Sequence, residues 1–224
     1  SRSARWYVVG TVAVLGVLAL ALAYDRISLR PEWSPWAALD IRERPNFLTR
    51  YKLSKLSHDR EQCLAVLGTT SWRYEVLSDR QTEDDCGLRN AVRIDGGETA
   101  VGEPFSLTCR TAVSLALWER HVLQPAARAH FNVPVSRIEH FGSYSCRNVY
   151  GRPNATRSRH ATAEALDIAG FRLADGREVR VLKDWAPDSD AARFLREVHE
   201  GACRFFDAVL GPGYNRAHLD HFHL

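Results

Sequence analysis

The stretch Glu164–Val181, EALDIAGFRLADGREVRV, predicts the element around which the rest of the fold is arranged. Two runs rich in β-forming residues flank Ala174-Asp175-Gly176, where the glycine supplies a turn, and this pattern is typical of a β-hairpin. Alternation along the first run puts Leu166 and Ile168 on one face and Asp167 on the other. We expect the two apolar side chains to enter the core and Asp167 to face a cleft across the sheet.

The segments around this hairpin predict helices that flank a small antiparallel sheet. Helical patterns of apolar residues occupy residues 48–67, most of residues 104–132 and the stretch that follows Asp188. Pro125 is expected to kink or divide the middle helix. Strands are predicted to end near Ile94 and to cross the core in the segment SRIEHFGSYSC. The fold class is therefore expected to be α+β.

The N-terminus differs in composition from the rest of the chain. Residues 6–24 contain no charged side chain, and Arg2 and Arg5 precede them. This length is close to the ~20 residues that cross a hydrocarbon core. We expect a transmembrane anchor over residues 6–24 after a cytoplasmic stub at residues 1–5, with everything that follows exported. A cleaved signal peptide is the alternative, because Ala21-Leu22-Ala23 resembles a cleavage site.

The remaining chain is interpreted as a linker followed by one domain. Residues 25–47 are rich in proline, tryptophan and arginine and show no sustained period, which indicates a linker. Residues 48–224 then form the exported domain. The chain is 45% hydrophobic with a net charge of +3, and its arginines are scattered. No nucleic-acid partner is expected from this distribution.

Five cysteines fit an exported domain, because disulfides persist in oxidising compartments. They allow two disulfides and one remaining thiol. We predict Cys63 with Cys86 and Cys146 with Cys203, which leaves Cys109 buried. None of the five forms a CxxC pair, so a structural zinc knuckle is not expected.

Histidines and an aspartate suggest a metal site between the hairpin and the end of the sequence. His160 and Asp167 lie in or just before the hairpin, and His221 and His223 share one face if the last residues are extended. If the two segments are neighbours, His160, Asp167 and one of the two terminal histidines converge. Two imidazoles and one carboxylate, with a fourth position for water, form the ligand set of a catalytic zinc.

Two motifs carry a resemblance to a known group of proteins. The spacing Ser158-x-His160-x-x-Ala163-x-Ala165-x-Asp167 resembles the S-x-H-x-x-G-x-A-x-D motif of zinc D-Ala-D-Ala peptidases, with Ala163 in place of glycine. The spacing His218-x-x-His221-x-His223 resembles the terminal motif of penicillin-insensitive murein endopeptidases. Both belong to the lysostaphin, D-Ala-D-Ala peptidase and hedgehog group. From about Leu48 onward the chain most resembles the bacterial extensin-like C-terminal domain family.

The resemblance implies a role for each of the candidate residues. The zinc ligands would be His160, Asp167 and His223. The proton carrier would be His221 or Asp220, and strand alternation favours His221, because Asp220 would point away from His223 in an extended strand. His218 or Asp220 would then orient His221. Arg147 resembles an arginine that faces the substrate carbonyl; a surface salt-bridge residue is the alternative.

The function expected from this resemblance is an exported zinc (Zn2+) peptidase. It would hydrolyse peptide stems or cross-links of bacterial peptidoglycan, as a DD- or LD-endopeptidase or carboxypeptidase. The expected location is the inner membrane, single-pass through the N-terminal helix, with the C-terminal domain in the periplasm. The alternative function is a non-catalytic, zinc-containing domain that binds or scaffolds the cell wall. Serine catalysis is not expected, because the sequence has no G-x-S-x-G stretch.

Overall fold

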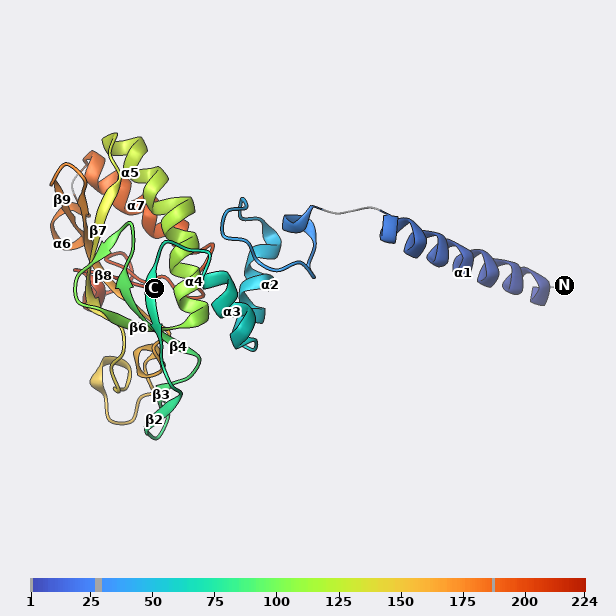
Figure 1. Ribbon diagram of the computed structural model, residues 1–224, viewed down its shortest axis with the longest axis horizontal. Coiled ribbons are helices and arrows are strands. Elements are labelled where there is room, and N and C mark those ends of the chain that lie inside the picture. Colours follow the sequence, from blue (N-terminus) through green and yellow to red (C-terminus); the bar gives the residue numbers. More distant parts are fainter. Residues whose placement is uncertain (1, 27–29, 187) are drawn as a thin grey trace.

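The computed structural model of the protein describes residues 2–26, 30–186 and 188–224. Figure 1 shows a helix, α1 (Arg2–Arg26), that lies apart from a mixed assembly of helices and strands. The first residue of the predicted stub, and residues 27–29 of the predicted linker, lie outside the described part.

The prediction of a transmembrane anchor over residues 6–24 is wrong. None of the described helices is both long and apolar enough to cross a membrane. A spanning helix needs about 20 consecutive apolar residues. The predicted single-pass location in the inner membrane is overturned with the anchor.

Helices in the rest of the chain follow the predicted segments, except that residues 105–108, which were predicted to be helical, form a strand. The pattern over residues 48–67 forms two helices, each capped by the side chain that precedes it, Asn46 and Asp59. The middle pattern is divided as expected, because a π-helical turn ends immediately before Gln124 and Pro125. The α-helices are α2 (Phe47–Leu56), α3 (Arg60–Leu67), α4 (Cys109–Trp118), α5 (Gln124–Phe131), α6 (Val181–Asp184) and α7 (Asp190–Ala202).

The short helical turns are η1 (Pro31–Trp33), η2 (Glu119–Leu123), η3 (Val149–Gly151), η4 (Arg159–Thr162) and η5 (Arg216–His218), of which η2 is the π-helical turn. Two of them, η4 and η5, contain histidines of the candidate site.

The strands form three sheets rather than the single small sheet that was predicted. The largest has the order β10-β8-β7-β5, with β9 also paired to β8. The pairing of β5 with β7 is parallel, so this sheet is not wholly antiparallel as predicted. Its strands are β5 (Ala100–Val101), β7 (Val135–Gly142), β8 (Asp167–Leu173), β9 (Glu178–Arg180) and β10 (Phe222–His223). The others are β1 (Arg73–Val76), β4 (Ala91–Gly96) and β6 (Phe105–Thr108) in one sheet, and β2 (Arg80–Glu83) with β3 (Cys86–Leu88).

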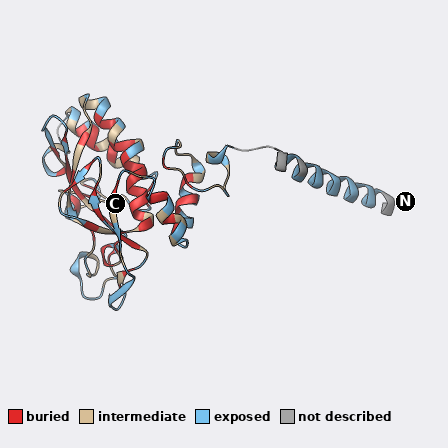
Figure 2. Ribbon diagram, viewed as in Figure 1, coloured by how far each residue is buried: buried red, intermediate tan, exposed pale blue. Residues whose placement is uncertain are grey.

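The predicted hairpin is confirmed as β8 and β9. Its turn contains Gly176 at a φ of +89°, a backbone conformation that glycine adopts without strain. Leu166 and Ile168 are buried and Asp167 is half-buried on the other face, as the alternation predicts. Phe171 of β8 packs against Trp118 and Phe194, and Figure 2 shows the buried residues between the strands and the helices α4, α5 and α7. The core therefore holds β8 rigidly behind Asp167.

Two disulfides are present, but the predicted pairing is wrong. Cys63 pairs with Cys109 and Cys86 with Cys146, while Cys203 is free and exposed. Cys63 lies in α3 and Cys109 is the first residue of α4, so that bridge follows the packing of two helices. The spacing of the cysteines along the chain carries no information about this packing.

Removing the buried disulfide is expected to destabilise the domain. The bridge between Cys63 and Cys109 closes a separation of 46 residues, and both cysteines are fully buried. The variant with Cys63→Ala and Cys109→Ala should lose about 2–4 kcal/mol of unfolding free energy, because its unfolded state is less constrained. Urea denaturation measures this loss. Cys203→Ala is the control, and an equal loss there would show that the bridge is not responsible.

Candidate metal centre

The side chains of His160, Asp167 and His223 meet at one end of the largest sheet. Nε2 of His160 lies 3.1 Å from Oδ2 of Asp167 and 3.1 Å from Nδ1 of His223. Nδ1 of His223 lies 2.8 Å from Oδ1 of Asp167. Each residue offers one ligand atom within 4.8 Å of the other two. The structure thus brings together the three residues that were predicted as metal ligands.

His160 is placed by a short turn of helix with an unusual end. The Ser158 side chain accepts a hydrogen bond from the backbone N–H of His160 and caps the turn η4. The turn ends at Ala163, which has a φ of +55° in the left-handed region. Glycine is favoured there because it has no Cβ. The motif S-x-H-x-x-G-x-A-x-D, which residues 158–167 resemble, has glycine at this position, and the left-handed backbone explains that preference. The structure shows that alanine also permits the turn.

The second nitrogen of His160 fixes the orientation of its ring. Nδ1 of His160 donates a hydrogen bond to the backbone carbonyl of Ser143, which directs the lone pair of Nε2 toward Asp167 and His223. Metal-binding histidines commonly donate their other N–H to a carbonyl or carboxylate in this way. This role of Ser143 could not be predicted, because every residue has a backbone carbonyl and the contact therefore leaves no pattern of residue types.

His223 is held by strand pairing on both sides. It lies opposite Asp167 in the antiparallel pairing of β10 with β8. The backbones of Leu166 and Leu224 exchange two hydrogen bonds of 2.9 and 3.0 Å, and His223 exchanges two of 2.9 Å with Leu210. Ladder bonds on both edges restrict the backbone, so the imidazole is presented to Asp167 from a fixed position.

The charge state of Asp167 suits a metal ligand. Burial alone would raise the pKa of this carboxyl. Hydrogen bonds with His160 and His223, and the charges of His160 and His221, outweigh burial and hold the pKa well below its usual range. Asp167 is therefore ionised at neutral pH, as coordination requires.

The donor set and its spacing fit zinc. Ligand distances of about 2.0–2.2 Å place neighbouring atoms of a tetrahedral site about 3.3 Å apart. Nε2 of His160 and Nδ1 of His223 lie 3.1 Å apart, close to that value. Each of the two nitrogens lies 2.8–3.1 Å from one of the two carboxylate oxygens of Asp167. One anionic carboxylate and two imidazoles, one of them with its tautomer fixed by Ser143, match a catalytic rather than a fully closed zinc site.

His221 lies beside the three candidate ligands and contacts Asp220. The prediction assumed an extended strand through both residues, whereas residues 219–220 form a turn and the strand begins only at Phe222. Nε2 of His221 lies 3.6 Å from Oδ1 of Asp167, and Nδ1 of His221 lies 2.8 Å from Oδ1 of Asp220. Asp220 is 47% exposed, whereas the His221 side chain is only 13% exposed. Asp220 therefore holds His221 from outside, and His221 faces the three ligands.

His218 lies beside these residues on η5. Its Nδ1 lies 2.8 Å from Oδ1 of Asn215, and its ring centre lies 5.2 Å from that of His221 and 5.9 Å from that of His223. Burial lowers the pKa of His218, and the charges of His221 and His223 lower it further. His218 is therefore neutral at neutral pH. Asn215, which the sequence did not single out, fixes the orientation of the ring.

Arg147 is not connected to the ligands in the described part of the chain. Its side chain is exposed and forms no ion pair among the residues that the structure describes. Its backbone carbonyl accepts a hydrogen bond from Ser158, two residues before His160. The loop that carries Arg147 is thereby fixed next to the site, with the side chain directed away from the protein interior.

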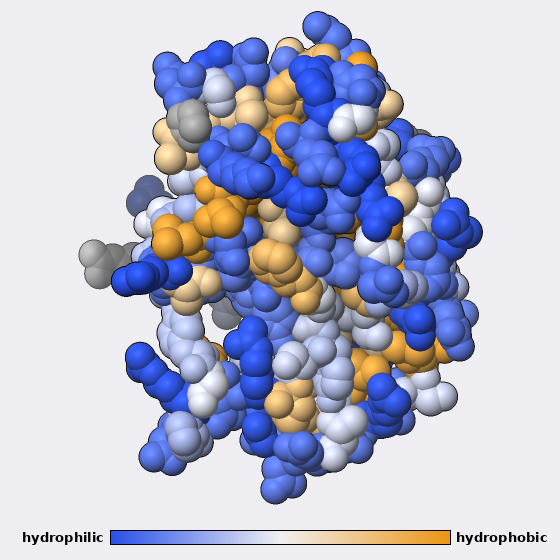
Figure 3. All heavy atoms as spheres, turned by 90° about the vertical axis from the view of Figure 1, so that its left-hand side faces the viewer, coloured by the Kyte–Doolittle hydropathy of each residue, from blue (hydrophilic) through white to orange (hydrophobic). Residues whose placement is uncertain are grey.

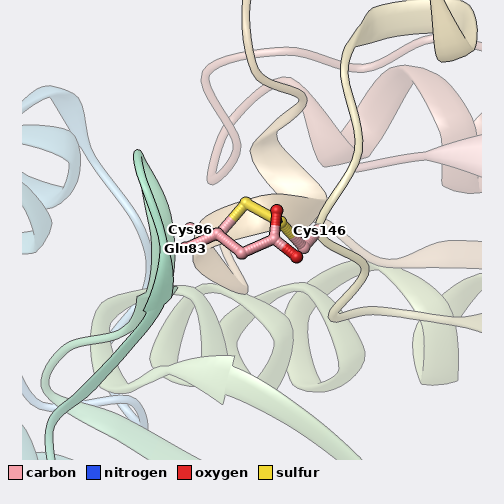
Figure 4. Close-up of side chains that lie close together, drawn as sticks. All are labelled: Glu83, Cys86 and Cys146. Carbon is pink, nitrogen blue, oxygen red and sulfur yellow. A yellow bond between two sulfur atoms is a disulfide. The ribbon is translucent and has the colours of Figure 1, made fainter.

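A second cluster of potential ligands does not form a metal site. Glu83 lies beside Cys86 and Cys146, as Figure 4 shows. The two sulfur atoms are bonded to each other in a disulfide, so neither is a thiolate that could bind a metal.

Comparison with known proteins identifies most of the chain. Residues 61–224 match a family model described as extensin-like protein C-terminus. No curated protein and no solved structure matches the chain. All the candidate site residues lie inside the matched range. The expected relation to zinc peptidases is not addressed by this match and stays a prediction.

Proposed function

For this chain, which belongs to the extensin-like protein C-terminus family, we propose the function of a zinc-dependent peptidase that hydrolyses peptide stems or cross-links of peptidoglycan. One observation carries the proposal. His160, Asp167 and His223 converge with ligand-like spacing, and a further histidine, His221, faces them. Structural zinc sites are closed by four protein ligands, whereas only three residues form this group, which leaves a fourth position for water. A hydrolytic site also needs a neighbouring group that moves protons, and His221 lies where it can do so.

The residues of the chain divide the chemistry between them. His160, Asp167 and His223 would hold a zinc ion, which would lower the pKa of a bound water to about 7 and polarise the scissile carbonyl. His221 accepts the proton that the attacking water loses and delivers it to the leaving amine. The hydrogen bond from Nδ1 of His221 to Asp220 holds the ring so that Nε2 faces the reacting atoms.

His218 and Arg147 are assigned to the substrate. His218 is neutral and its Nδ1 donates to Oδ1 of Asn215, so its Nε2 carries a lone pair and can accept a hydrogen bond from an N–H group of the bound peptide. Arg147 projects from a loop that the Cys86–Cys146 disulfide and the hydrogen bond to Ser158 hold beside the site. Its exposed guanidinium is free to contact a carbonyl of the bound peptide.

Hydrolysis by the purified full chain tests the proposal. The protein loaded with zinc should release peptide fragments from isolated peptidoglycan, and a chelator should abolish the release until zinc is restored. Mass spectrometry of the fragments identifies the bond that is cut. Binding to peptidoglycan without any release, by zinc-loaded protein, would instead support the non-catalytic wall-binding function.

A further inference from the structure

A large cavity lies next to the candidate metal centre and is strongly basic. Its volume is about 790 Å³. Its lining includes Arg157, Ser158 and Arg159, the three residues that directly precede His160. Five arginines and two acidic residues line the cavity, which gives its lining an excess of three positive charges. This excess equals the net charge of +3 on the whole chain. The arginines are Arg80, Arg89, Arg110, Arg157 and Arg159.

Two cross-links make the wall of this cavity rigid. The disulfide between Cys86 and Cys146 joins β3 to the loop that follows β7 (Figure 4). Arg157 donates from Nε and Nη2 to the backbone carbonyl of Asp84, at 3.2 and 2.9 Å, and from Nη1 to Asn148 at 3.1 Å. The hairpin of β2 and β3 is thereby fixed to the segment that leads into His160. A preformed wall avoids the ordering cost that weakens binding to flexible loops.

Part of the positive charge has no acidic partner. Among the described residues, no carboxylate lies within 4.0 Å of the guanidinium of Arg80 or Arg89. Arg110 pairs with Asp207 at 2.7 Å, but its buried Nε has no hydrogen-bond partner in the described chain. Arg110 also lies in the first turn of α4, whose N-terminal dipole adds to the positive potential.

The arginines extend toward the metal centre. Arg110, Arg159 and Glu164 line the large cavity and also a smaller one of about 150 Å³. The smaller cavity is lined by His223 as well. A ligand that reaches from one cavity into the other would therefore pass from the arginines to a candidate zinc ligand.

The face of the molecule drawn in Figure 3 is largely hydrophilic, and its hydrophobic residues form small separate patches. The residues that line the arginine-rich cavity are likewise mostly polar or charged, so charge rather than an apolar surface would select its ligand.

We infer that the arginine-lined cavity binds the carboxylate groups of an acidic peptide, and that this peptide is the one whose backbone reaches the metal centre. Guanidinium groups bind carboxylates through paired, charge-assisted hydrogen bonds. The identity of the peptide as a substrate rests on the proposed peptidase function, whereas the binding of carboxylates does not. Phosphate groups offer similar chemistry, and the test separates the two.

The test uses the full chain after treatment with a chelator, so that no hydrolysis interferes. The probe is a fluorescein-labelled hexapeptide of glutamate, and a hexapeptide of glutamine is its neutral counterpart. In the variant with Arg80→Gln and Arg89→Gln, the Kd for the acidic probe should rise about tenfold or more, which corresponds to about 1.4 kcal/mol. Fluorescence anisotropy measures the Kd, and higher salt should weaken the binding of the unmodified protein.

The matched control removes two arginines elsewhere. The variant with Arg177→Gln and Arg193→Gln has the same change in net charge, at exposed residues that pair with Asp175 and Asp190. It should keep the affinity of the unmodified protein. Equal losses in the two variants would mean that only net charge matters and would overturn the inference. Binding of the glutamine probe as tight as that of the glutamate probe would do the same.

Competition with inorganic phosphate shows whether the cavity binds carboxylate groups or phosphate groups. Displacement of the acidic probe by short glutamate peptides, at concentrations where phosphate has no effect, supports the inference. Displacement by phosphate alone assigns the cavity to phosphate-bearing ligands and overturns it. Hydrolysis by the zinc-loaded protein is measured separately. If the zinc-loaded protein does not hydrolyse peptidoglycan but its binding of the acidic probe depends on Arg80 and Arg89, only the peptidase function is refuted. If it hydrolyses peptidoglycan but probe binding does not depend on these arginines, only the cavity assignment is refuted.

Discussion

His223→Ala is expected to remove zinc and peptidoglycan hydrolysis together. Zinc contributes about 10–16 kcal/mol in sites with four protein ligands, so one ligand accounts for roughly 3 kcal/mol, or more than 100-fold in affinity. After dialysis against a weak chelator, the ratio of zinc to protein should fall from near one to near zero. Elemental analysis of the dialysed protein gives this ratio, and fragment release gives the activity.

His160→Ala and Asp167→Ala should behave in the same way, because the three ligand atoms lie within 4.8 Å of one another. His130→Ala is the control, since His130 lies on α5 and pairs with Glu197 at 2.8 Å. Circular dichroism confirms that each variant is folded. If zinc content survives all three substitutions in folded protein, these residues are not the ligands.

His221→Ala is expected to keep zinc and lose activity. The ring faces Asp167 at 3.6 Å, outside the set of three ligand atoms, so its removal leaves the donors intact. The value of kcat should fall by about 10²–10⁴-fold, the contribution of a general acid–base group. Zinc content and kcat, measured on the same preparation, separate this variant from His223→Ala.

Asp220→Asn shows which of the two neighbours carries the proton. The exposed carboxylate of Asp220 contacts Nδ1 of His221 and acts through that ring, so asparagine should reduce kcat less than the loss of His221. If Asp220→Asn abolishes hydrolysis while His221→Ala remains active, the carboxylate is the base. The assignment of His221 would then be wrong.

Local sequence patterns were sufficient to predict the hairpin and the approach of His160 and Asp167 to the terminal histidines, whereas the choice of His223 as the third candidate ligand came from the family resemblance. The alternation of Leu166, Asp167 and Ile168 depends only on the period of a strand, and burial of the two apolar residues fixed which face Asp167 takes. His221 and His223 both lie near Asp167, although β10 begins only at Phe222 and residues 219–220 form a turn.

Features that depend on contacts distant in sequence could not be predicted. The partner of Cys63 is set by the packing of α3 against α4, and the partner of Cys86 by a loop 60 residues later. The parallel pairing of β5 with β7 depends on the route of the chain through α4 and α5. The carbonyl of Ser143 that orients His160 is a backbone group, for which no residue pattern exists.

The pairing of β10 with β8 links metal content to correct assembly of the last strand. His223 lies opposite Asp167, and its neighbour Phe222 is fully buried opposite Ile168. A shift of one residue would exchange these two side chains, placing a phenyl ring at the metal position and an imidazole in the core. With the zinc chemistry proposed above, a chain assembled in the shifted alignment could not take up the ion. Zinc would then bind only molecules in which β10 pairs with β8 in the correct register. In a preparation saturated with zinc, the metal-free fraction would equal the fraction of misassembled molecules.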